Sequence, residues 1–219
     1  MVKLMLALDV LNEKKALDIV NSTSDYVDAI KIGYPLVLAT KLDIIKKIKD
    51  ISKKEIICDF KLADIPSTNE KITSLALKYG DGIICHGFVG EDSIRAVQKV
   101  VKDLEMETGQ GKKVIMVTEM SHPGALRFMA PVSDDLAEMA KKLNVDAIVA
   151  PSTRPERLQH IKNIVEDIPI ISPGIGAQGG HIDEVLRILG EEDYIIVGRG
   201  IYESENPREE AHKYYKLLK

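Results

Sequence analysis

Short apolar runs rich in β-branched residues alternate along the whole chain with longer amphipathic segments. Because the short runs are almost wholly apolar, they predict strands buried on both faces, as in a parallel sheet. Successive runs begin roughly 22 to 33 residues apart, which is the length of one βα unit. The predicted strands are 3–9, 27–32, 55–60, 82–86, 113–118, 146–150, 168–172 and 193–197.

The segments between these runs predict helices, among them 42–51, 92–107, 134–143, 155–166 and a terminal helix from Pro207. Eight βα units in 219 residues predict an α/β fold, a (β/α)8 TIM barrel that forms a single domain over residues 1–219. An open doubly wound sheet is the alternative, but no Gly-x-Gly-x-x-Gly follows the first predicted strand. Internal repetition is expected to go no further than the βα period.

Composition narrows the possible partners. With 30 basic and 34 acidic residues the chain lacks the electrostatic footprint of a nucleic-acid binder. No apolar run approaches the ~18 residues that cross a bilayer, and Asp9 interrupts the first run too early for a signal peptide. Cys58 and Cys85 lie in apolar runs, where we expect buried thiols without a disulfide. We therefore expect a cytoplasmic protein with no nucleic-acid or membrane partner.

Charged residues gather where the predicted strands end. Asp9 ends the first, Lys31 ends the second, and Asp59-Phe-Lys-Leu-Ala-Asp64 ends the third with two carboxylates around one lysine. Barrel enzymes build their sites at the C-terminal ends of the strands, whereas a structural role alone would scatter polar residues over both ends. The sequence therefore predicts an active site there. Further residues expected at the same end are His86, Ser121, His122, Ser152, Pro173, Gln178 and Arg199.

Asp59 and Lys61 are two positions apart in a strand, so both should project from one face. Burying such a cluster costs several kcal/mol per ion unless the charges satisfy one another. Flanking carboxylates favour the ammonium form of Lys61, which makes it a poor base and a good proton donor. For Asp64 helix capping is the alternative, since Pro66 and Thr68 resemble a helix start.

Two glycine-rich segments predict a phosphate site. The segment 172–180 follows the seventh predicted strand, and Gly198-Arg-Gly200 follows the eighth. Glycines let main-chain N–H groups approach an anion, and the loops after strands 7 and 8 commonly bind phosphate in these barrels. Arg199 would supply a bidentate donor. The alternative is that the glycines serve only tight turns.

The two histidines near the strand ends are open to more than one interpretation. His86 and His122 could bind a metal with Cys85 or Glu119, but no metal-type spacing supports this, and a structural role is favoured.

The polar loops after the fifth and sixth strands are the last candidates. Ser121 has no His–Asp partner pattern, so hydrogen bonding to a substrate is a better interpretation than a nucleophile. Ser152 or Thr153 is expected to cap the sixth helix. The role of Arg154 stays open.

Taken together, these motifs resemble the orotidine monophosphate decarboxylase family, particularly its short archaeal form. The matching segments span essentially the whole chain, and the Asp-x-Lys-x-x-Asp core is specific in combination with Lys31. They are 8–9, 31–35, 59–66 with Thr68, 118–124, 151–157, 172–180 and 198–199.

The resemblance implies decarboxylation of orotidine 5′-monophosphate to UMP without a cofactor or metal. It also implies roles for four charged residues. Asp9 and Lys31 would hold ribose hydroxyls, with Lys31 also bonded to Asp59, which would lie against the substrate carboxylate. Lys61 would protonate C6 of the pyrimidine as carbon dioxide leaves.

The resemblance further implies a homodimer in which Asp64 and Thr68 reach the neighbouring subunit's site. Ser121 would read the pyrimidine, Gln178 would bridge the phosphate loop and the base, and Arg199 would clamp the phosphate. The expected substrate-binding set is completed by Ile65, Pro173, Gly174 and Gly198.

Two rival functions are weighed against this one. Sugar-phosphate decarboxylases such as ketogulonate phosphate decarboxylase share the Asp-x-Lys-x-x-Asp motif but place a magnesium-binding glutamate where Lys31 stands, and an ammonium repels a divalent cation. A non-catalytic nucleotide-binding barrel would not need Lys61 between two carboxylates.

Overall fold

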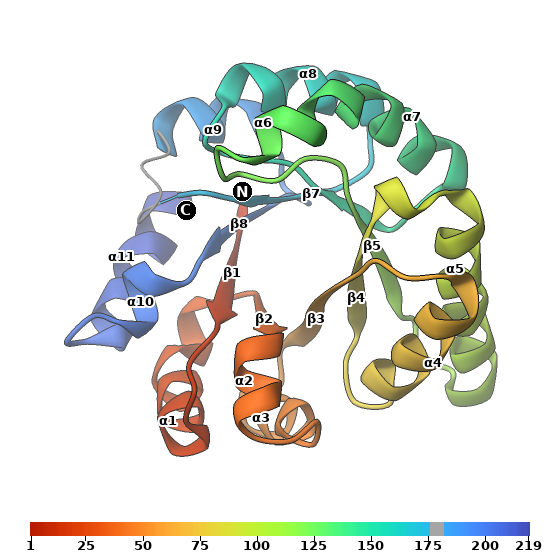
Figure 1. The fold of residues 1–219 in the computed structure, drawn as a ribbon. Helices are drawn as coiled ribbons and strands as arrows, with labels where there is room; N and C mark the ends of the chain where they lie inside the picture. Colours follow the sequence, from red (N-terminus) through yellow and green to blue (C-terminus); the bar gives the residue numbers. More distant parts are fainter. Residues whose placement is uncertain (176–181) are drawn as a thin grey trace.

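The computed structural model describes residues 1–175 and 182–219. Its eight strands are parallel and close into a barrel in chain order, with β8 pairing with β1. Figure 1 shows the strands on the inside of the molecule with the helices around them. The strands are β1 (Lys3–Leu8), β2 (Ala29–Gly33), β3 (Glu55–Leu62), β4 (Gly82–His86), β5 (Lys113–Val117), β6 (Ala147–Val149), β7 (Ile170–Pro173) and β8 (Tyr194–Val197).

The predicted TIM barrel is confirmed, and every predicted strand lies where a strand is found. The extension of the single domain over all of residues 1–219 stays a prediction. No helix in the described part of the chain is long and apolar enough to cross a membrane. The helices are α1 (Glu13–Thr23), α2 (Tyr34–Ala39), α3 (Ile44–Ser52), α4 (Pro66–Leu77), α5 (Glu91–Thr108), α6 (Ala125–Phe128), α7 (Ser133–Leu143), α8 (Pro155–Val165), α9 (Ile182–Ile188), α10 (Arg199–Tyr202) and α11 (Pro207–Leu218).

The barrel forms because the strands and the surrounding helices bury apolar side chains against one another. All residues of β1 from Leu4 to Leu8 are buried, as both faces of a parallel strand require. On the outside, α3 buries Ile44, Ile45 and Ile48 along one stripe, which packs on the sheet while its lysines face solvent. Cys58 and Cys85 are free and buried, as expected.

The N-terminal end of the barrel contains a repeated carboxylate contact. An aspartate immediately precedes each even-numbered strand and accepts a hydrogen bond from a main-chain N–H at the start of the preceding odd-numbered strand. The bonds run from Leu4 N to Asp28 Oδ2 (2.8 Å), Ile56 N to Asp81 Oδ2 (3.0 Å), Val114 N to Asp146 Oδ2 (2.7 Å) and Ile170 N to Asp193 Oδ1 (2.7 Å).

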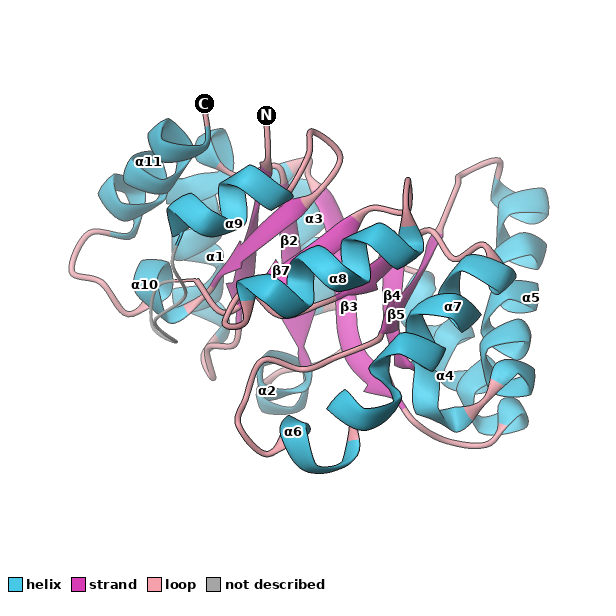
Figure 2. Cartoon of the chain, turned by 90° about the horizontal axis from the view of Figure 1, so that it is seen from above, coloured by secondary structure: helices cyan, strands magenta, loops and turns pink. Residues whose placement is uncertain are grey.

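One sequence expectation was therefore wrong. Internal repetition does not stop at the βα unit, because the aspartates recur once in every two units. Polar residues also occupy both barrel ends, because the N–H groups at strand starts need acceptors too. Figure 2 shows both termini at this end of the barrel, opposite α2 and α6.

Candidate active site

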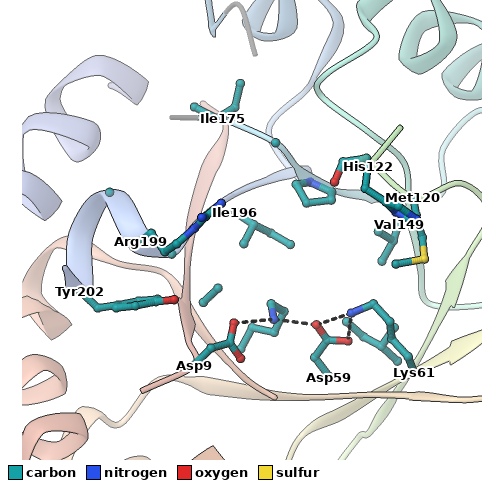
Figure 3. A pocket seen from close by; sticks show the side chains of 18 residues that line it. Asp9, Asp59, Lys61, Met120, His122, Val149, Ile175, Ile196, Arg199 and Tyr202 are labelled. Atoms are coloured by element: carbon teal, nitrogen blue, oxygen red, sulfur yellow. Dashed lines mark hydrogen bonds and ion pairs between the residues drawn. The ribbon is translucent and has the colours of Figure 1, made fainter. Parts of the chain in front are cut away.

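Three charged side chains form a continuous line at the C-terminal mouth of the barrel. Lys31 lies on β2, and Asp59 and Lys61 lie on the adjacent β3, where Gly33 pairs with Asp59. Lys31 Nζ is 2.6 Å from Asp59 Oδ2, and Lys61 Nζ is 2.8 Å from both oxygens of the same carboxylate. Figure 3 shows this line of contacts along one side of a cavity. Asp59 is therefore held between two ammonium groups.

The environment keeps this line ionised. Lys31 and Asp59 are buried, whereas Lys61 is about one-third exposed. Burial opposes the charge on Lys31, but the Asp59 and Asp9 carboxylates outweigh it and raise the pKa of that ammonium. Burial also works against the charge on Asp59, yet Lys31 and Lys61 hold its pKa below the usual value.

Asp9 extends the line from the end of β1. Its Oδ2 lies 4.0 Å from Lys31 Nζ, and about a third of its side chain is exposed to the cavity mouth. Gly33 makes this position possible, because a Cβ at that residue would collide with Asp9 Oδ1. The aspartate and the lysine can thus face one ligand together.

A cavity of about 420 Å³ opens in front of these residues. Arg199 and His122 lie on other sides of it (Figure 3). Gly174, in the cavity wall, has a φ of 120°. Because this backbone conformation favours glycine, a residue with a side chain would be strained at this position. Gln178 lies outside the described residues. The predicted site residues that line the cavity are Asp9, Lys31, Asp59, Lys61, Ser121, Pro173, Gly174, Gly198 and Arg199.

Asp64, Ile65 and Thr68 do not line this cavity. Asp64 and Ile65 are exposed on the turn between β3 and α4. The capping alternative for Asp64 is not what is found: the N-cap is Ile65, and among the described residues Asp64 Oδ1 accepts only the adjacent N–H of Ile65 (2.7 Å). The carboxylate is therefore presented to solvent in the single chain.

Comparison with known proteins identifies the family. The model of the orotidine 5′-phosphate decarboxylase / HUMPS family matches residues 2–214. The orotidine 5′-phosphate decarboxylase of Methanocaldococcus jannaschii is 65% identical over 218 residues, covering 100% of this chain and 99% of the relative. The Thermococcus kodakarensis enzyme of the same name is 47% identical, covering 99% and 96%. This chain belongs to the orotidine 5′-phosphate decarboxylase / HUMPS family.

Solved structures agree with this assignment. The crystal structure of the Methanocaldococcus jannaschii decarboxylase complexed with inhibitor BMP matches with a TM-score of 0.95 and covers 100% of this chain and 99% of that one. The Pyrococcus horikoshii enzyme, 42% identical, matches with a TM-score of 0.87 and covers 98% of each chain. The family resemblance stated from the sequence is confirmed.

Lys61, in the motif that pointed to the family, has an unusual backbone. Its φ is 40°, in the left-handed region, which costs a non-glycine residue about 1 to 2 kcal/mol. The β3–β4 register shifts between Cys58 and Leu62, so an irregularity in β3 spans Asp59 and Lys61. The side chains of Asp59 and Lys61 thus meet because of a bulge as well as strand alternation. The sequence argument used strand alternation alone.

Sequence reasoning missed the ion pairs that Glu119 makes on the β5–α6 loop. Glu119 is fully buried and accepts from Arg154 Nε (3.0 Å) and Arg157 Nε (3.3 Å). Arg154 also donates to the carbonyls of Met120 and Ser121. Two guanidinium groups thus neutralise Glu119, which was weighed above as a metal ligand, and Arg154 braces the loop that carries Ser121. The spacing offered no signal, since Glu119 lies on the β5–α6 loop and both arginines lie at the start of α8.

The capping prediction for the helix that follows β6, α8, was wrong. Its N-cap is Arg154, which makes no side-chain capping bond. Ser152 is buried and its Oγ lies 2.6 Å from Ser172 Oγ, while Thr153 Oγ1 donates to the Ser121 carbonyl (3.0 Å). These hydroxyls tie neighbouring loops together.

The two histidines differ in their surroundings. His122 lines the cavity, whereas His86 is buried at the end of β4 against Phe88, with ring centroids 4.7 Å apart. Burial, followed by the charge of Lys61, lowers the pKa of His86 to about 4. Among residues 1–175 and 182–219, no three His, Cys, Asp or Glu side chains are grouped so that they could hold a metal ion.

Proposed function

We propose that this chain decarboxylates orotidine 5′-monophosphate to UMP and carbon dioxide in pyrimidine synthesis, without a cofactor, and that Lys61 donates the proton to C6. A relative of this name at 65% identity supports the reaction. The observation on which the mechanism rests is the Lys31–Asp59–Lys61 line, whose ammonium groups flank one carboxylate at the cavity wall.

Lys61 meets the main chemical demand of this reaction. Loss of carbon dioxide from C6 leaves an electron pair in the plane of the pyrimidine, where the ring delocalises it poorly. An ammonium held ~3 Å from that carbon stabilises the developing charge and then delivers its proton. The two 2.8 Å contacts to Asp59 fix the direction of the Lys61 side chain before substrate binds.

Asp59 is proposed to lie against the substrate carboxylate. Two like charges ~4 Å apart repel by about 4 kcal/mol at an effective dielectric near 20. This repulsion disappears as neutral carbon dioxide departs, so Asp59 disfavours the bound substrate more than the transition state. The low pKa of Asp59 keeps the carboxylate charged for this role.

Binding groups remote from C6 would offset that repulsion. Asp9 and Lys31 are suited to the ribose hydroxyls, since one accepts and the other donates hydrogen bonds. Arg199 is suited to the phosphate, and Ser121 to the pyrimidine edge. The proposed binding set also includes Ile65, Thr68, Pro173, Gly174, Gln178 and Gly198.

The charge pattern supports a metal-free reaction. Both oxygens of Asp59 already contact ammonium groups, and Lys31 stands where the sugar-phosphate relatives are expected to have a glutamate. A divalent cation at this point would be repelled by two adjacent positive charges. The absence of nucleic-acid and membrane partners and the cytoplasmic location stay predictions from composition.

A homodimer would complete the site. Six large apolar side chains are exposed on the segments that follow β2 to β5, on one side of the barrel mouth, and a second copy that covers them would bring its own Asp64 and Thr68 toward this cavity. The six are Tyr34, Leu38, Ile65, Phe88, Leu126 and Phe128. Figure 2 shows α2 and α6, which carry four of them, at the same end of the barrel.

The test is a spectrophotometric assay with orotidine 5′-monophosphate, with and without EDTA. Turnover unaffected by the chelator is expected. Lys61→Ala should lose at least about 10⁴-fold in kcat, because both the proton donor and the positive charge go, while UMP still binds. Magnesium-dependent turnover, or an active Lys61→Ala variant, would overturn the mechanism.

A further inference from the structure

A closed triangle of hydrogen bonds holds the turn that carries Asp64. The Asp64 carbonyl accepts from Asn69 Nδ2 (3.0 Å) and from Ser93 Oγ (2.7 Å), and Asn69 Nδ2 also donates to Ser93 Oγ (2.8 Å). Asn69 and Ser93 are fully buried. They come from the first turns of α4 and α5, so the turn is fastened to two helices at once.

The chemistry of the triangle leaves no freedom in how Asn69 is oriented. The Asp64 carbonyl can only accept, so the amide must present its nitrogen, and both amide hydrogens are then used. Asn69 Oδ1 is left buried with no hydrogen-bond partner among the described residues. An apolar side chain of similar size would fill this space without that cost. The role of Asn69 is therefore to fix the position of the Asp64 carbonyl.

The fastened backbone contrasts with the side chain of Asp64. Its carboxylate is exposed and accepts only the adjacent Ile65 N–H within the described part of the chain. The backbone is therefore held from the helix side, whereas the carboxylate is exposed and does not line the chain's own cavity.

We propose that Asn69 and Ser93 are positioning residues that hold the Asp64 turn so that its carboxylate enters the cavity of the second subunit. This inference rests on the proposed function, in which Asp64 acts in the neighbour's site. The pair touches no substrate: it acts through Asp64, and it acts across the subunit boundary.

Three variants test the role of the triangle. Asn69→Leu removes both donated bonds, and a resulting misplacement of the carboxylate by ~1 Å should lower kcat/KM about 10²-fold, with UMP binding changed far less. Ser93→Ala is the milder variant, because Asn69 still donates to the carbonyl, and a loss of about tenfold is expected. Thr73→Val is the matched control: Thr73 is also buried on α4, its hydroxyl has no partner among the described residues, and a change within about twofold is expected.

Subunit mixing separates this role from a purely structural one. A chain with Asn69→Leu keeps its own Lys61, and a chain with Lys61→Ala keeps its own Asp64 turn. In a mixed dimer, the cavity of the first chain receives an intact turn from the second. A one-to-one mixture that exchanges freely should therefore recover about a quarter of the unmodified activity, although each variant alone is nearly inactive.

Each outcome of the mixing experiment supports or refutes the role of Asn69 across the subunit boundary. Recovery of activity supports it. A mixture of Asp64→Ala and Lys61→Ala chains that recovers activity, while the Asn69→Leu mixture does not, overturns it, because Asn69 would then act within its own subunit. If the Asp64→Ala mixture also fails, the role of Asp64 across the boundary is wrong and the inference falls with it. An unmodified chain that does not decarboxylate orotidine 5′-monophosphate would instead refute the proposed function. If Asn69→Leu does not fold, the same mixture is made with Ser93→Ala.

Discussion

The two ends of the barrel use carboxylates in opposite ways. At the N-terminal end, Asp193 accepts two main-chain N–H groups, those of Ile170 and Gly190 (both 2.7 Å), and also contacts Lys162. At the C-terminal end, Asp59 contacts side-chain ammonium groups and faces a cavity. A carboxylate bonded to the backbone fixes where strands begin. A carboxylate bonded to movable ammonium groups holds charge ready for a ligand.

Burial and charge alone therefore do not mark an active site. Both aspartates are buried, and each has a lysine within 3 Å. What separates them is the remaining partner. Main-chain N–H groups cannot leave or transfer a proton in a reaction, whereas Lys61 can do so. Substitutions confined to one end of the barrel test this division.

The largest effect is expected at the C-terminal end. Asp59→Asn keeps the shape of the side chain but removes the charge that faces the substrate carboxylate and orients Lys61. We expect kcat to fall about 10²- to 10³-fold, the range seen when one preorganised electrostatic contact is lost. Single-turnover decarboxylation, measured on protein whose cooperative unfolding has been checked, gives the answer. A variant within tenfold of the unmodified rate would show that the charge of Asp59 is not needed.

The reciprocal change at the N-terminal end should affect stability and not chemistry. Asp193→Ala leaves the N–H groups of Ile170 and Gly190 without their acceptor and Lys162 without its counter-charge. We expect a loss of about 3 kcal/mol in the free energy of unfolding, with kcat per folded molecule unchanged. Urea unfolding and the decarboxylation assay measure the two quantities on the same sample. A fall in kcat without a fall in stability would contradict the division between the two ends.

The same difference between the two ends explains which features could be predicted from the sequence. The strands were predictable because each is a nearly continuous apolar run, and the ends of these runs located Asp9, Lys31, Asp59 and Lys61 at one rim. The aspartates of the N-terminal end were not recognised, because a carboxylate beside a strand looks the same in sequence whether it contacts water or an N–H group.

Three other features of the C-terminal end gave no signal in the sequence. The left-handed backbone at Lys61 gave no signal, since glycine is the residue that usually marks such a conformation. Arg154 finds Glu119 only when the β5–α6 and β6–α8 loops meet. Asn69 and Ser93 meet only because α4 and α5 begin beside the same turn. Residue patterns within one segment cannot report such pairs.

The smallest expected effect concerns His86, a titratable group at the C-terminal end with a buried Nδ1 that has no hydrogen-bond partner in the described part of the chain. Burial, followed by the charge of Lys61, lowers its pKa from an ordinary 6.5 to about 4. Between these values the unfolded chain binds a proton that the folded chain does not. Stability therefore falls as the pH drops through this window.

The His86 contribution between pH 7 and pH 5 should be about 1 to 2 kcal/mol, since one pKa unit corresponds to about 1.4 kcal/mol. In His86→Gln the free energy of unfolding should fall by that much less over this interval, whatever its value at pH 7. His212→Gln, which removes an imidazole packed on Tyr26 away from the charged line, is the matched control for the loss of one histidine. Urea unfolding at the two pH values measures the difference. If His86→Gln loses as much stability on acidification as the unmodified chain, the imidazole titrates alike in the folded and unfolded states, and neither burial nor the charge of Lys61 lowers its pKa.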